Sequence, residues 1–97
     1  MAYDPGAIDA TLAAAVGDEP QLIAELRFAF VEGVQRGLDT LAAARSGDEW
    51  RGAAARLKGL AASFGAIRLM AIAGEAIDAP PHDPAMLRKL KRAVERL

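Results

Sequence analysis

Groups of proline, glycine and helix-capping residues divide this chain into short segments, and this division constrains the fold more than any other feature of the sequence. The groups lie at residues 4–5, 17–20, 46–49 and 80–84, with a softer break at Gly65. Each of the four carries glycine or proline together with an acidic or hydroxyl side chain that can cap a helix. In the last group, Asp83 supplies a cap in front of Pro84, which suits a first helical turn. The sequence therefore predicts helices joined by short connections.

Apolar residues between the breaks recur at the spacing of α-helices. Within residues 21–45, where Gly37 allows close approach by a neighbour, they form the stripe Ile23, Leu26, Phe30, Val34, Leu38 and Leu41. Shorter sets are Ile8, Leu12 and Val16; Leu69, Ile72, Ala73 and Ala76; and Leu87, Leu90, Val94 and Leu97. Because short connections favour antiparallel neighbours, we expect an all-α fold. It would be an antiparallel up-down four-helix bundle with an additional N-terminal helix, forming a single domain over residues 1–97.

Composition and charge exclude several classes of function. The chain has no cysteine, and its one histidine and scattered carboxylates predict neither a metal site nor a cofactor. The net charge of −1 argues against nucleic acid as a partner. The basic last segment lacks interleaved aromatic residues, and its cations suit a helix C-terminus; it contains Arg88, Lys89, Lys91, Arg92 and Arg96. No apolar run approaches the roughly 20 residues of a membrane span, and no signal-peptide pattern is present, so a cytoplasmic protein is expected.

Residues 48–64 form the most unusual segment. One side of this predicted helix collects the core residues Trp50, Ala53, Leu57, Leu60, Ala61 and Phe64. The other side is nearly bare, and we call it the docking face; it comprises Arg51, Gly52, Ala55, Arg56, Lys58, Gly59 and Ala62. Each glycine inside a helix costs about 1 kcal/mol relative to alanine. A smooth strip with a basic rim suits a negatively charged partner surface, although alanine-rich helices can also be bare without a functional reason.

The order of residues along this segment resembles the histidine-containing phosphotransfer (HPt) family. The family signature is His-x-Leu-Lys-Gly, a short stretch of small residues, a hydrophobic residue with Gly-Ala, and a leucine three positions later. The matching residues here are Ala55-Arg56-Leu57-Lys58-Gly59, Ser63-Phe64-Gly65-Ala66 and Leu69. The resemblance extends over most of the chain through Gly17-Asp18, Phe30, Leu41 and Gly47-Asp48. It implies an HPt-like helical bundle and a role in two-component phosphorelay signalling.

One departure from the family determines the expected function. The phospho-accepting histidine of the family falls at Ala55, whose methyl group cannot accept a phosphoryl group. The lysine beside the phosphate and the glycine that admits the partner remain, as Lys58 and Gly59, while the serines common after that glycine are replaced by Leu60 and Ala61. The resemblance implies a non-catalytic module, not an enzyme, that binds a response-regulator receiver domain or a histidine kinase without accepting phosphate. A monomer is expected.

Two other functions stay open at this point. The chain could be an active phosphotransfer protein with a different acceptor, for which His82 is the one candidate; we expect His82 instead to be a solvated loop residue. The chain could also be a structural bundle that self-associates through its bare face, which a bulky residue at Ala55 or Ala62 would disrupt. Phe28 lies on the outward side of its segment, where the N-terminal helix is expected to cover it; an exposed anchor for a partner is the alternative.

Overall fold

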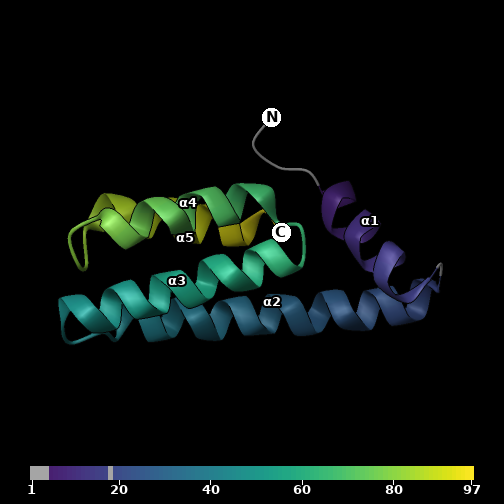
Figure 1. The fold of residues 1–97 in the computed structure, drawn as a ribbon, viewed down its shortest axis with the longest axis horizontal. Helices are drawn as coiled ribbons and strands as arrows, with labels where there is room; N and C mark the ends of the chain where they lie inside the picture. Colours follow the sequence, from purple (N-terminus) through teal and green to yellow (C-terminus); the bar gives the residue numbers. More distant parts are fainter. Residues whose placement is uncertain (1–4, 18) are drawn as a thin grey trace.

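The computed structural model describes residues 5–17 and 19–97, and within them it contains five helices and no strand (Figure 1). The helices are α1 (Pro5–Val16), α2 (Pro20–Ala42), α3 (Gly47–Ser63), α4 (Ile67–Asp78) and α5 (Pro84–Glu95). The prediction of an all-α fold is therefore confirmed. The capping roles expected for Asp4 and Asp18 fall outside the described residues.

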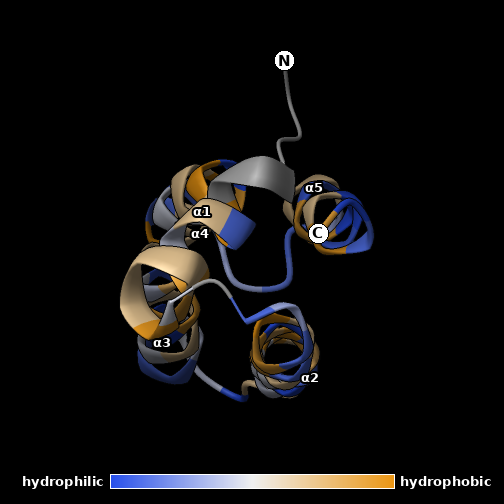
Figure 2. Ribbon diagram, turned by 90° about the vertical axis from the view of Figure 1, so that its right-hand side faces the viewer, coloured by the Kyte–Doolittle hydropathy of each residue, from blue (hydrophilic) through white to orange (hydrophobic). Residues whose placement is uncertain are grey.

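Helices α2 to α5 lie side by side, and each runs opposite to the one before it (Figure 1). Seen along the helices, α3 lies beside α2 and α4, and α5 lies beside α4 and α2 (Figure 2). Helix α1 contacts α2 near one end of the molecule. The antiparallel order follows from the short connections, since three to five residues can join only neighbouring helix ends.

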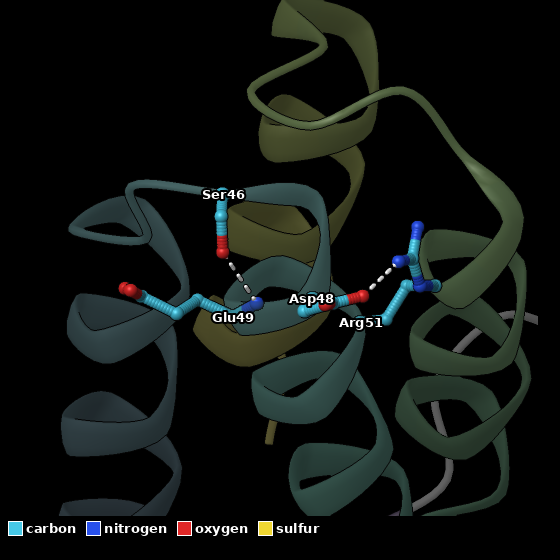
Figure 3. Close-up of polar contacts among 4 residues, drawn as sticks. All are labelled: Ser46, Asp48, Glu49 and Arg51. Carbon is cyan, nitrogen blue, oxygen red and sulfur yellow. Dashed lines mark hydrogen bonds and ion pairs between the residues drawn. The ribbon is translucent and has the colours of Figure 1, made fainter.

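Side chains cap the starts of α3 and α5. Ser46 Oγ accepts a hydrogen bond from the Glu49 amide at 3.1 Å (Figure 3), and Glu49 Oε1 accepts one from the Arg45 amide at 3.0 Å. This reciprocal pair is a variant of the capping box. Asp83 caps α5 as predicted, because its Oδ2 accepts from the Met86 amide at 3.0 Å.

Glycine in the left-handed conformation ends α3, where the sequence had only a soft break. Gly65 has a φ of 70°, and its amide donates to Ala62 O at 3.2 Å while the Ala66 amide donates to Ala61 O at 2.9 Å. These two bonds form a Schellman motif. A residue with a Cβ would adopt the left-handed conformation of Gly65 only under strain. The turn brings α4 back along α3.

The core lies between the four antiparallel helices. Its largest fully buried side chains are Trp50, Phe30, Leu41, Leu57, Leu69, Leu90 and Val34. Phe30 of α2 stacks on Phe64 at the end of α3, with ring centroids 4.5 Å apart. The predicted close approach at Gly37 is confirmed: a Cβ there would lie 3.2 Å from Leu57 Cδ1. Most of the predicted apolar stripes are buried or packed against this core.

The prediction that the N-terminal helix covers Phe28 is wrong. Helix α1 buries Ile8 and Leu12, and its Asp9 pairs with Arg27 of α2 at 2.9 Å. This contact brings α1 to the Arg27 side of α2, and the neighbouring Phe28 side chain stays 65% exposed. Phe28 and Ile67 are the two large apolar residues exposed in the described part of the chain.

Candidate docking surface

Helix α3 separates a buried side from an exposed side along its whole length. Trp50, Ala53, Ala54, Leu57 and Ala61 are buried. Six of the predicted docking-face residues are exposed and one, Gly52, is half-buried; the exposed ones are Arg51, Ala55, Arg56, Lys58, Gly59 and Ala62. The helical period therefore places them as the sequence indicated, because residues four and seven apart share a side.

Ala55, Gly59 and Ala62 form the bare centre of the docking face. Their spacing places them on one line along α3, and no heavy atom of a neighbour lies within 4 Å of a Cβ built at Gly59. Ser63 Oγ donates to Gly59 O at 3.0 Å, which occupies that hydroxyl within the helix. The centre thus offers a partner small side chains and accessible backbone.

The Lys58 side chain of α3 lies against Gly74 of α4. A Cβ built at Gly74 of α4 would lie 3.8 Å from each of the last three atoms of the Lys58 side chain. Gly74 therefore leaves room for the lysine stem, and the ammonium group reaches the α4 side of the docking face. Sequence reasoning missed Gly74; an isolated glycine within a helix was the available signal.

The two arginines of the docking face are turned back along their own helix. Arg51 pairs with Asp48 (Figure 3), and its guanidinium lies 3.2 Å from a Cβ built at Gly47. The Arg56 guanidinium lies 3.6 Å from a Cβ built at Gly52. Because exposed ion pairs are weak, Asp48 competes only modestly with a partner for Arg51. Arg51 nonetheless sits at the N-terminal edge of the face, away from its centre.

Gly59 of the docking face packs against no neighbouring element, so a substitution there tests whether the fold needs this glycine. Its Cβ position is open and its backbone is helical, so Gly59→Ala is expected to stabilise the fold by about 1 kcal/mol through helix propensity alone. Urea unfolding followed by circular dichroism measures this change. Gly37→Ala is the matched control: it gains the same propensity but crowds Leu57, so its net gain is smaller. A loss of stability in Gly59→Ala would show that this glycine is retained for the fold.

His82 is exposed and directly precedes the α5 cap, but it is not a free loop side chain. Its Nε2 donates to Ala44 O at 2.6 Å, and its ring lies 5.5 Å from the Trp50 ring. The residue holds a left-handed backbone with a φ of 62°, a conformation that costs energy in a non-glycine residue. The side chain therefore ties the α4–α5 connection to the α2–α3 connection. An acceptor role at Nε2 would first require breaking this bond.

Within the described residues, no three or more His, Asp or Glu side chains gather where they could hold a metal ion, and no buried side chain is charged. The described helices also include none that is both long and apolar enough to cross a membrane. The docking face itself presents small residues, open backbone at Gly59 and the exposed cations Arg51, Arg56 and Lys58.

No family model, curated protein or solved structure matches this chain.

Proposed function

We propose that this protein is an HPt-like module that binds a response-regulator receiver domain through the docking face and accepts no phosphate. The observation that carries the proposal is the combination of Lys58 and Gly59 on an exposed, bare helix with alanine at position 55. A phosphorelay protein needs an imidazole at that place as the nucleophile. Lys58 and Gly59 match the residues that follow this histidine in the HPt signature, and this match supports docking without transfer.

The arrangement of the helices supports the same proposal. An HPt domain is a four-helix bundle that carries its acceptor histidine in mid-helix, and α2 to α5 provide a comparable antiparallel set with Ala55 in the middle of α3. Ala55 is exposed, so a partner can reach it. The Schellman turn at Gly65 coincides with the Gly-Ala of the family signature.

Electrostatics and shape give the docking face its proposed specificity. The phosphorylation pocket of a receiver is acidic, and Lys58 and Arg56 carry exposed positive charge toward such a surface. Gly59 and Ala62 let the partner backbone approach closely. Binding without transfer occupies the receiver, so the protein would sequester it or compete with an active phosphotransfer protein.

The proposal is tested by a binding titration and a phosphotransfer assay on the same samples. A panel of receivers and active histidine kinases supplies the partners. Saturable binding with no label on this chain is the expected result. Label on the chain would overturn the non-catalytic assignment, and the labelled residue would identify the acceptor.

Charge reversal at Lys58 is expected to weaken receiver binding about tenfold or more, because attraction to the acidic pocket becomes repulsion. Arg56→Glu should act in the same direction. Isothermal titration calorimetry at low and high salt measures both changes. Lys91→Glu is the control, since Lys91 is an exposed cation of α5, and α5 lies diagonally across the bundle from α3 (Figure 2). If Lys58→Glu and Lys91→Glu bound equally well, receiver docking at this face would be excluded.

A further inference from the structure

A shallow hollow on the opposite helix pair concentrates positive charge that the docking face does not use. Its volume is about 40 Å³, and it is lined by Arg68 of α4 together with Lys89, Arg92, Ala93 and Arg96 at the end of the chain. We call these residues the basic hollow. The hydrophilic side of α5 faces away from the core (Figure 2). The four cations that line the hollow are exposed, so it opens to solvent.

Three of the four cations have no carboxylate partner in the described part of the chain. Lys89 Nζ pairs with Glu75 Oε1 of α4 at 2.6 Å. The other ion pairs of the described residues join Arg27 to Asp9 and Arg51 to Asp48, so Arg68, Arg92 and Arg96 are in none of them. Bringing three uncompensated guanidinium groups around one depression is unfavourable, because like charges repel.

Helix electrostatics account for only part of this cluster. Arg92 and Arg96 lie in or just after the last turn of α5, where a cation is favoured by the helix dipole. Arg68 is the second residue of α4, and a cation is disfavoured at a helix N-terminus. The α4 start also has no acidic residue in its first turn to compensate Arg68. An anion bound in the hollow would offset both the repulsion among the three guanidinium groups and the unfavourable position of Arg68 at the start of α4.

We propose that the basic hollow binds a compact phosphate-bearing small molecule, with Arg68, Arg92 and Arg96 as the ligating residues. Guanidinium groups present paired N–H donors that match the oxygens of a phosphate group, and such charge-assisted bonds are stronger than neutral ones. The volume of about 40 Å³ leaves room for a phosphate group. Nucleic acid fits less well, because no aromatic residue lines the hollow to stack on a base.

The Lys89–Glu75 pair sets the edge of this site. Glu75 is the carboxylate that pairs with one of the lining cations, and it holds Lys89 on the α4 side. Because Glu75 already neutralises Lys89, the positive charge left for a ligand is that of Arg68, Arg92 and Arg96. The site shares no residue with the docking face, so the two proposals can fail separately.

The test uses the whole chain and pyrophosphate as the probe, titrated at low ionic strength. Nitrogen-15 spectra of the arginine Nε–H groups report which side chains respond, and calorimetry gives the affinity. Saturable one-to-one binding is expected, with shifts at Arg68, Arg92 and Arg96. Arg92→Gln and Arg68→Gln should each weaken binding about tenfold, a loss of one charge-assisted contact.

Arg88→Gln is the matched control, because it removes the same charge from an exposed position of α5 that does not line the hollow. Its affinity is expected to stay within about twofold of the unmodified chain, as for a charge beyond direct contact. Equal weakening by Arg88→Gln and Arg92→Gln, or no saturable binding, would overturn the proposal. Tighter binding of a polyglutamate peptide than of pyrophosphate would overturn the small-molecule assignment.

Discussion

Replacing Trp50 with alanine is expected to lower the free energy of unfolding by about 3–5 kcal/mol, the range for emptying the space of a large buried aromatic residue. The Trp50 side chain is fully buried. Its Nε1 donates to Ala76 O at 2.7 Å, which joins α3 to α4. In a domain of this size the loss corresponds to a melting temperature lower by roughly 20 °C. Urea unfolding and thermal melts of the purified variant measure both quantities.

The hydrogen bond of Trp50 matters because of the sequence at the end of α4. The amide that would normally bond to Ala76 O belongs to Pro80, which has none. The Ala79 amide reaches this oxygen at 3.2 Å, and the indole supplies the shorter contact. Trp50→Phe keeps most of the volume and removes the donor, so we expect it to cost about 1–2 kcal/mol.

Phe28→Ala is the control for the Trp50 prediction. Phe28 is also an aromatic residue in a helix, but its side chain is 65% exposed. Its truncation should change stability by less than about 0.5 kcal/mol, as is usual at the surface. A similar loss in Phe28→Ala and Trp50→Ala would contradict the described core, and so would a Trp50→Ala loss below about 1 kcal/mol.

The helices and their core sides could be predicted from the sequence, because local rules determine them. Proline, glycine and capping residues limit each helix, and apolar spacing alone places Leu69, Ile72, Ala73 and Ala76 on the buried side of α4. The Gly37 contact was also accessible, since a glycine on an otherwise apolar stripe indicates a close neighbour.

The contacts that could not be predicted from the sequence are those that depend on which helices pack together. The cover expected over Phe28 depended on the side of α2 that α1 occupies, and the Arg27–Asp9 contact lies beside it. The bond from His82 to Ala44 O joins residues 38 apart in the chain. Gly74 acquires its role only because Lys58 of another helix lies over it. Such contacts follow from tertiary packing, which periodicity within one segment does not encode.

The proposed function predicts a second large effect, at position 55. We expect Ala55→His to convert the chain from one that takes up no phosphate into one that does. Position 55 is exposed in the middle of α3, so the new imidazole has access to a partner. Lys58, one turn along the helix, provides a cation near the incoming phosphoryl group, and Gly59 leaves room for the donor. Because the position is exposed, the change should cost only about 0.5 kcal/mol in helix propensity.

The measurement is transfer of labelled phosphate from a phosphorylated receiver that binds the unmodified chain. The phosphoryl group leaves the receiver's aspartate and bonds to an imidazole nitrogen, so the label should be acid-labile and stable to base. Ala62→His is the matched control: it places a histidine on the same exposed face, two turns from position 55. Label on Ala55→His alone is the expected result. If a receiver bound Ala55→His as tightly as the unmodified chain but transferred no label, the docking geometry inferred from the HPt resemblance would be wrong.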